Sequence, residues 1–135
     1  LRELAVECAQ AIDELAARVP AIGPDAHGEA ALHGFLRAFF DTYAHYGVVI
    51  RAWMENQVSD RNVDRLGVDA FTHIAQAFGL QLHAAGAPHD EATVAALMAL
   101  LERTSYAMSS RDLGLNPTTT LDTLAKVIHR GFFIP

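Results

Sequence analysis

The sequence predicts an all-α fold, a bundle of five or six helices. Long stretches carry apolar residues three and four positions apart, which is the spacing of an amphipathic helix. No stretch has the alternating, β-branched pattern typical of strands. Glycine, proline and short polar runs divide the chain near residues 20–24, 47, 59–62, 86–88 and 114–117. At 135 residues, we expect a single domain over 1–135 with a core of its own.

The first four helices are predicted from the placement of their apolar residues. Arg2 to Val19 carries one apolar stripe and should cover the bundle with one face. Gly28 to Tyr46 has more aromatic surface than one helix contact can absorb, so we expect it to be the central helix. Gly47 permits a bend into a short apolar helix, Val48 to Val58. A longer helix, Asn62 to Ala85, follows with apolar residues at heptad-like spacing.

The last two helices have the clearest start signals. Pro88 is predicted to open the fifth helix, because its missing amide hydrogen costs nothing in a first turn, and Asp90 complements the positive end of the dipole. This helix should extend to residue 109. Asn116 should cap the sixth helix and Pro117 should open it. Apolar residues cover more than half of the fifth helix, so it must be covered from two sides, and the sixth is apolar enough to need a partner.

Composition excludes several classes of function. The formal net charge is -6 and the few basic residues are scattered, so these residues by themselves should not bind nucleic acid. No apolar run approaches the ~20 residues of a membrane helix, and the start at Leu1 lacks a secretion signal. We therefore expect a cytoplasmic piece of a longer protein, with no membrane partner. The single cysteine, Cys8, excludes an internal disulfide and a thiolate metal site.

Aromatic and sulfur side chains gather on the predicted helices between residues 28 and 85. Such a stripe is usually plain core, but a cavity between helices, lined by aromatics and a few polar groups, is also the usual form of a small-molecule site. Two charges within the apolar fifth helix, Glu102 and Arg103, should either pair with another element or point into a polar corner of a pocket. The candidate ligand-binding residues are Phe35, Phe39, Tyr43, Trp53, Met54, Phe71, Phe78, Met98 and Arg103.

The last two helices also suggest self-association. A helical pair that is apolar on its outward side exposes a patch too large for a monomer, and a two-fold dimer is the common remedy. Two copies would then form a four-helix bundle from their last two helices. The alternative is that these helices are simply central within a monomer.

The chain resembles the C-terminal domain of the TetR family of transcriptional regulators. The stretch Phe39 to Asp60, FFDTYAHYGVVIRAWMENQVSD, is similar to the aromatic helix, loop and short helix in the middle of that domain. The stretch Leu97 to Gly131, with LLERTSYAM and TTTLDTLAKVIHRG, is similar to its paired dimerisation helices. The dimer-face residues that this resemblance implies are Tyr106, Leu121, Leu124, Ala125, Ile128 and Phe132.

The resemblance implies a function as well as a fold. The family has an N-terminal helix-turn-helix domain that is missing from this chain, and residues 1–19 would be the connector helix toward it. A small hydrophobic or aromatic effector would shift the population toward a conformer whose recognition helices no longer match DNA half-sites about 34 Å apart, as in a repressor. The implied partners are a second copy, the effector, and DNA through the missing domain only.

Neither a metal site nor a catalytic site is predicted. Acid and histidine four apart on a helix share one face, but such pairs usually form hydrogen bonds or lie in solvent. Three exist: Glu29/His33, Asp41/His45 and Asp69/His73. The chain has no Glu-x-x-His and no His-Glu-x-x-His. The serines at 105, 109 and 110 have no nucleophile elbow, so we expect no enzyme activity and no cofactor.

Two other functions remain open from the sequence. The first is a helical protein-interaction module whose apolar C-terminal face binds a different chain and no small molecule. The second is a small helical-bundle enzyme, which a bound metal or cofactor would reveal. The ligand-sensing dimer is the interpretation that accounts for both the aromatic cluster and the last two helices.

Overall fold

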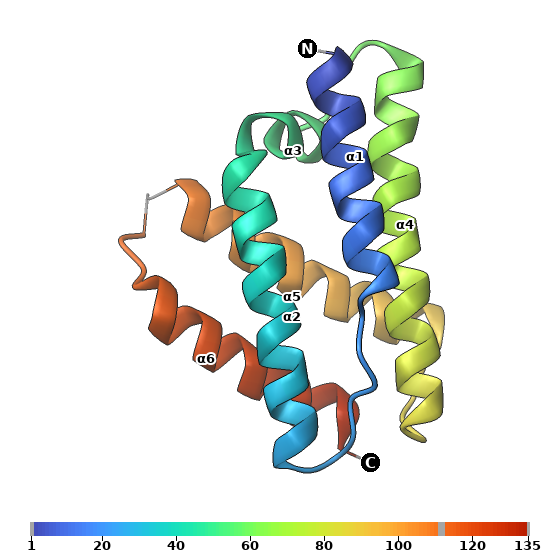
Figure 1. The fold of residues 1–135 in the computed structure, drawn as a ribbon, viewed down its shortest axis with the longest axis vertical. Helices are drawn as coiled ribbons and strands as arrows, with labels where there is room; N and C mark the ends of the chain where they lie inside the picture. The colour runs from blue at the N-terminus through green and yellow to red at the C-terminus, as the bar shows by residue number, and fades with distance from the viewer. Residues whose placement is uncertain (1, 111–112, 135) are drawn as a thin grey trace.

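A computed structural model describes residues 2–110 and 113–134 of the chain, and it is all-helical over those residues. Six α-helices are followed by one short π-helix, η1 (Figure 1). Their bounds are α1 Arg2–Ala17, α2 Ala26–His45, α3 Gly47–Met54, α4 Arg61–Ala84, α5 Glu91–Ser110, α6 Pro117–Ile128 and η1 His129–Phe133. The predicted all-α class and the upper helix number are therefore confirmed for the described part of the chain.

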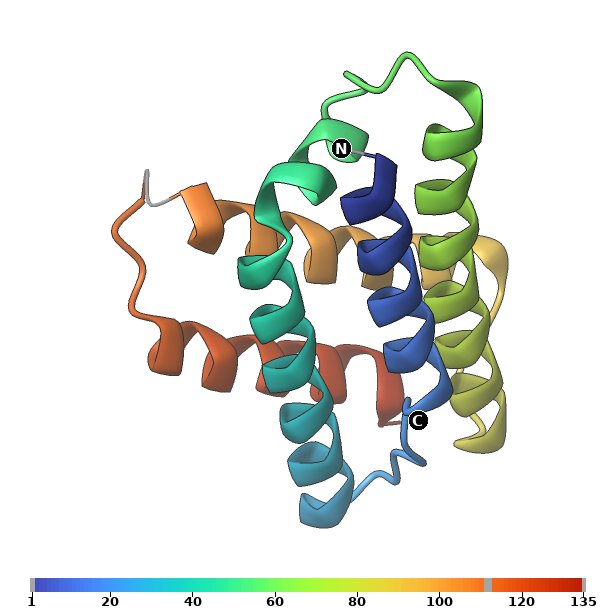
Figure 2. The same ribbon diagram turned by 45° about the horizontal axis from the view of Figure 1, so that its top comes forward.

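The helices form two layers that cross each other. In both views α1 and α4 lie side by side, with α2 next to α1, and α5 and α6 run across behind them (Figures 1 and 2). The short α3 joins the top of α2 to the loop before α4. The corner between α2 and α3 therefore lies above the ends of α5 and α6. A pocket can form in the space between this corner and those two helix ends.

Polar side chains set the helix starts. The Asp25 carboxylate accepts a hydrogen bond from the Gly28 amide, the Asp60 carboxylate accepts from the Asn62 and Val63 amides, and the Asn116 side chain accepts from the Thr119 amide. Each satisfies an amide that the helix itself leaves unpaired. The predicted cap at Asn116 and the predicted Pro117 start of α6 are confirmed.

Two predicted helix bounds differ from the observed ones by three residues or more. Pro88 does not open α5. The Asp90 side chain accepts hydrogen bonds from the amide and hydroxyl of Thr93, and the helix begins one residue after Asp90, at Glu91. The short helix α3 ends at Met54 rather than at residue 58, because Asn56 adopts a positive φ of 55° that turns the backbone out of the helix. Asparagine tolerates this left-handed conformation better than most residues.

Aromatic rings fill the space between the two layers. Phe35 and Phe78 meet edge to face with 5.3 Å between ring centroids, and Phe133 of η1 lies 6.5 Å from Phe78. Phe39 packs on Phe35 from the next turn of α2, at 6.4 Å. All four side chains are buried, so this cluster joins α2, α4 and η1 into one core.

Two glycines allow close approaches elsewhere in the core. A Cβ at Gly28 would lie 1.8 Å from the Gly23 carbonyl oxygen, and a Cβ at Gly67 would lie 2.4 Å from the Trp53 ring. The Trp53 indole also donates to the Val63 carbonyl at 3.0 Å, which fixes α3 against α4. The buried His129 donates from Nε2 to the Gly23 carbonyl at 2.8 Å and so ties the C-terminal turn to the α1–α2 loop.

None of the described helices combines the length and apolarity that a membrane crossing needs. Cys8 is fully buried on α1, and this burial raises the pKa of its thiol to about 12. The Cys8 sulfur therefore stays protonated at neutral pH, and a thiol held in this form reacts slowly.

Candidate ligand-binding pocket

A pocket of about 470 Å³ lies where the α2–α3 corner meets α5 and α6. This volume falls within the range of about 300–1,000 Å³ that is usual for small-molecule sites. Its lining consists of Arg37, Phe40, Asp41, Tyr43, Ala44, His45, Gly47, Val48, Arg51, Ser105, Met108, Ser109, Pro117, Thr118 and Leu121. Four helices contribute to it, and both layers of the fold form its walls.

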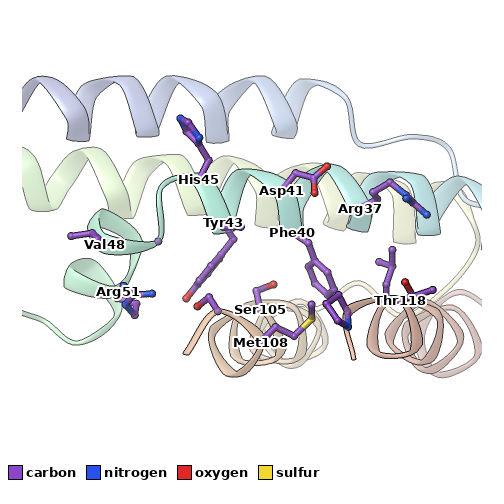
Figure 3. A pocket seen from close by; sticks show the side chains of 15 residues that line it. Arg37, Phe40, Asp41, Tyr43, His45, Val48, Arg51, Ser105, Met108 and Thr118 are labelled. Atoms are coloured by element: carbon purple, nitrogen blue, oxygen red, sulfur yellow. The ribbon is translucent and has the colours of Figure 1, made fainter. Parts of the chain in front are cut away.

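The walls of the pocket are largely apolar. Phe40 and Tyr43 extend from α2 toward α5 and α6, and Met108 rises from α5 to meet them (Figure 3). Leu121 of α6 lines the same space. Phe40 and Met108 are only half-buried, which leaves apolar surface that an occupant could cover.

The Tyr43 phenol is fixed at the α3 end of the pocket. It is 1% exposed, and its hydroxyl donates to the Met54 sulfur at 2.7 Å. Burial, and next the nearby Glu102 carboxylate, raise the pKa of Tyr43 above its ordinary value. The phenol therefore stays neutral at physiological pH, and its oxygen can accept a hydrogen bond from an occupant.

Other polar side chains of the lining come from all four helices, among them Arg37 of α2, Arg51 of α3, and Ser105 and Ser109 of α5. The Ser105 hydroxyl donates to the Leu101 carbonyl at 2.8 Å and the Ser109 hydroxyl donates to the Tyr106 carbonyl at 3.1 Å, both within α5. Their oxygens keep lone pairs that can accept from an occupant. Arg51 lies at the α3 end of the pocket and Arg37 at the opposite end (Figure 3). A few polar groups in an apolar cavity are what fix the orientation of a small molecule.

A second, more open groove of about 510 Å³ lies between α4 and α5. Phe71, Val94 and Met98 form its apolar part and Glu102 lies at one end. Within the part of the chain that the structure describes, the Glu102 carboxylate has no hydrogen bond or ion pair. Desolvation by burial raises the pKa of Glu102 to about 7.

We expect the Glu102→Gln variant to be more stable than the parent chain at pH 8, by about 1–3 kcal/mol, and equally stable near pH 4.5. Glu102 has a pKa of about 7 in the folded chain against 4.5 when solvated. The folded state thus binds its proton more tightly, and stability is lost as pH rises through this window. Each unit of pKa corresponds to about 1.4 kcal/mol, and the remaining exposure of Glu102 reduces the total.

Urea unfolding of both proteins from pH 4.5 to 8 measures this difference. Glu91→Gln is the matched control, because Glu91 lines the same groove but is exposed. An identical pH dependence for the parent chain and Glu102→Gln would show that Glu102 titrates as a solvated carboxyl.

The nine predicted ligand-binding residues do not form one site. Tyr43 lines the pocket, and Phe71 and Met98 line the second groove. Phe35, Phe39 and Phe78 pack on one another in the core and line neither cavity. Trp53 and Met54 hold α3 in place, on Gly67 and against the Tyr43 hydroxyl, and the exposed Arg103 lies over the Tyr106 ring at 4.7 Å.

Four of the six predicted dimer-face residues lie inside the subunit. Leu121, Leu124, Ala125 and Ile128 are at most 6% exposed, whereas Tyr106 and Phe132 are half-buried. The four buried side chains belong to the core of a single chain and have little surface left for a second copy. The exposed side chains of α5 and α6 are instead small or mostly polar, and they include Ala92, Ala95, Ala96, Ala99, Asp122, Thr123, Lys126 and Val127.

Most of the pocket could not be recognised from the sequence. The apolar pattern of the sequence favours a core position for Phe40, and it marks Met108 and Arg51 only as parts of their own helices. The available signal is the α2–α3 corner itself, because a short helix after a bend leaves an unfilled angle between its neighbours. The pocket begins in that angle, beside α3, and extends between α2 and the pair α5 and α6 (Figure 3).

Two histidines of the predicted acid–histidine pairs contact acids on other helices. His33 contacts Asp122 of α6 and His73 contacts Asp13 of α1, each at 2.7 Å, instead of the acids four residues away in sequence. Over residues 2–110 and 113–134, no three histidine, cysteine or acidic side chains come close enough together to hold a metal ion. The described site therefore consists of a pocket without a metal-ligand cluster.

Comparisons of the chain with protein-family models, with curated proteins and with solved structures found no match. Any function proposed for the chain therefore depends on its own geometry and on the sequence resemblance given above.

Proposed function

We propose that this chain is the ligand-sensing and dimerisation domain of a TetR-type transcriptional repressor, and that the pocket under the α2–α3 corner holds its effector. The observation that carries the proposal is the pocket itself: about 470 Å³, with largely apolar walls and polar side chains from four helices. The helix order also supports it. A first helix, a long aromatic helix, a short helix, a long helix and a final pair follow one another as the resemblance implies.

The effector is a small hydrophobic or aromatic molecule. It binds between the two layers, against Phe40 and Tyr43 on one side and Met108 and Leu121 on the other. Because it touches both layers, its binding favours the conformer with the layers at one particular separation. A ligand shifts an equilibrium only through such a difference in affinity between two conformers.

The pocket is connected to the first helix by a direct contact. Tyr46, at the α2–α3 corner, donates a hydrogen bond from its hydroxyl to Glu7 of α1 at 2.9 Å. Its neighbours His45 and Gly47 both line the pocket. In the proposed mechanism, a shift of this corner moves α1, which is the connector to a DNA-binding domain encoded before Leu1. That domain would be a basic helix-turn-helix, and the upstream coding sequence tests this part directly.

Dimerisation through α5 and α6 belongs to the proposal and has its own test. The contact would use the exposed side chains of these helices, chiefly the alanines of α5 and Val127 of α6. Sedimentation should give the mass of two chains. A monomer at micromolar concentration would remove the dimer from the proposal and leave the pocket as a separate question.

We expect Thr118→Phe to weaken ligand binding at least tenfold, because the new ring would occupy the pocket. Thr118 is exposed on α6 and lines the pocket. The probes are 1-decanol and naphthalene, measured by isothermal titration calorimetry. The fluorescence of Trp53, the single tryptophan, reports independently on α3.

The matched control is Thr123→Phe, which makes the same exchange at an exposed position of the same helix that does not line the pocket. It should bind both probes as the parent chain does. Equal affinity in Thr118→Phe and Thr123→Phe, or no binding of either probe to the parent chain, would contradict the proposed effector site.

A further inference from the structure

The α3 end of the pocket is positively charged. The Arg51 guanidinium folds back over the start of its own helix, where a Cβ at Gly47 would lie 3.1 Å from its Nη1. The first turn of a helix carries the positive end of the helix dipole. Two positive features therefore meet at one corner, next to the Tyr43 ring (Figure 3).

No carboxylate of the described residues balances this charge. Among the described residues, the arginine ion pair is that of Arg2 with Asp60, and Arg51 has no carboxylate within ion-pair distance. Arg51 is nevertheless half-buried. A partly desolvated guanidinium without a partner is unfavourable, and a helix start beside it adds to the cost.

The acidic groups nearby do not fill this role. Asp41 is the one carboxylate among the pocket's lining residues, and it points away from α5 and α6, on the side of α2 where His45 also points (Figure 3). Glu102 influences the Tyr43 phenol but lines the other groove. Among residues 2–110 and 113–134, no carboxylate takes the position beside Arg51, and an occupant of the pocket could supply one.

We propose that the pocket binds an amphipathic organic anion, whose carboxylate pairs with Arg51 and whose apolar part lies against Phe40, Met108 and Leu121. The inference rests on the proposed effector site and specifies the chemical class of its ligand. A guanidinium offers two parallel N–H donors, which match the two oxygens of a carboxylate. The Ser105 and Ser109 hydroxyls already donate to carbonyls of their own helix. They therefore cannot replace Arg51 as donors to an anion unless those two hydrogen bonds break.

The pocket shape orders the ligand from one end to the other. Arg51 and Tyr43 lie at the α3 end, Met108 and Phe40 come next, and Thr118 and Arg37 lie at the far end (Figure 3). An anionic head at Arg51 thus places an apolar tail over the half-buried Phe40 and Met108. A straight alkyl chain and an aromatic acid both meet this description, and the probes must separate them.

The test compares four probes that differ in one feature at a time. Decanoate, 1-decanol and decylamine share a chain and differ in charge, and 2-naphthoate replaces the chain by rings. We expect decanoate to bind the parent chain at least tenfold more tightly than 1-decanol, and decylamine to bind most weakly, by isothermal titration calorimetry at low salt. The ratio of decanoate to 2-naphthoate then identifies an alkyl or an aromatic acid as the better ligand.

Arg51→Gln should weaken decanoate binding by about 10- to 100-fold, the range expected for loss of a charge-assisted pair, and leave 1-decanol within about twofold. Arg51→Lys should lie between, because an ammonium keeps the charge but not the paired donors. Arg65→Gln removes the same charge from an exposed position of α4 outside the pocket and should change neither affinity.

Two kinds of failure are distinguishable. In the first, 1-decanol binds the parent chain and its binding is lost in Thr118→Phe, so the effector site stands. The anion inference is nevertheless overturned if decanoate binds no more tightly than 1-decanol, or if Arg51→Gln leaves the affinity for decanoate unchanged. If neither probe binds the parent chain, both fall. Thermal unfolding of each variant is recorded beside the titrations, so that an unfolded protein is not counted as a loss of affinity.

Discussion

Replacing Phe78 by alanine is expected to lower the free energy of unfolding by about 3–5 kcal/mol, the usual cost of removing a buried phenylalanine ring. Phe78 is 0% exposed and lies between Phe35 of α2 and Phe133 of η1. Its removal leaves a cavity that three separate elements line, so none of them can close it alone. Urea unfolding monitored by circular dichroism measures the loss.

Phe71→Ala is the control for this prediction. Phe71 is also on α4, but it is half-buried and lines the open groove, so its loss should cost less than half as much. The comparison also decides between two interpretations of the aromatic stripe. A stable Phe78→Ala protein with altered ligand binding would place Phe78 in a ligand site, as the sequence alone suggests, and would contradict its role as core.

The local structure of this chain is predictable because its signals are local. The Asn116 cap and the Pro117 start of α6 depend on atoms within three residues. The bend at Gly47 and the polar break before α4 are of the same kind. Periodicity likewise predicts which residues of each helix face inward, since that requires only the helical repeat.

The pocket is not predictable in the same way. Phe39 and Phe40 are neighbours on α2, yet Phe39 packs in the core while Phe40 lines the pocket. A helix turns about 100° per residue, so adjacent aromatics face different elements, and the sequence does not say which. The crossing of α5 and α6 behind α2 decides this, and it is a property of the whole assembly.

The surroundings of the charged residues are likewise not predictable from the sequence alone. The sequence marks Glu102 and Arg103 as unusual in an apolar helix, but only Glu102 points into a groove, and Arg103 lies in solvent over Tyr106. The important cation is Arg51, one turn from Gly47 on the short helix. Its significance depends on the absence of a carboxylate partner among the described residues, and such an absence is visible only in three dimensions.

Gly28→Ala is expected to destabilise the chain by about 3–5 kcal/mol, through overpacking together with the loss of a buried hydrogen bond. A Cβ at this position would lie 1.8 Å from the Gly23 carbonyl oxygen, and the atoms that it meets are backbone rather than the end of a flexible side chain. The α1–α2 loop must therefore shift. The same carbonyl accepts the hydrogen bond from buried His129, so the shift also detaches the C-terminal turn. Urea unfolding again gives the magnitude.

Gly34→Ala supplies the control within the same helix. Gly34 is exposed and nothing lies within 4 Å of the position that a Cβ would take, so alanine there should stabilise the chain by about 0.5–1 kcal/mol through helix propensity alone. The two exchanges are chemically identical and differ only in what the new methyl group meets. Changes of opposite sign in the free energy of unfolding would establish that the contact between α2 and the Gly23 carbonyl is tight. Equal stabilisation by both exchanges would instead mean that the α1–α2 loop can move aside, and with it the link from α1 to the C-terminal turn.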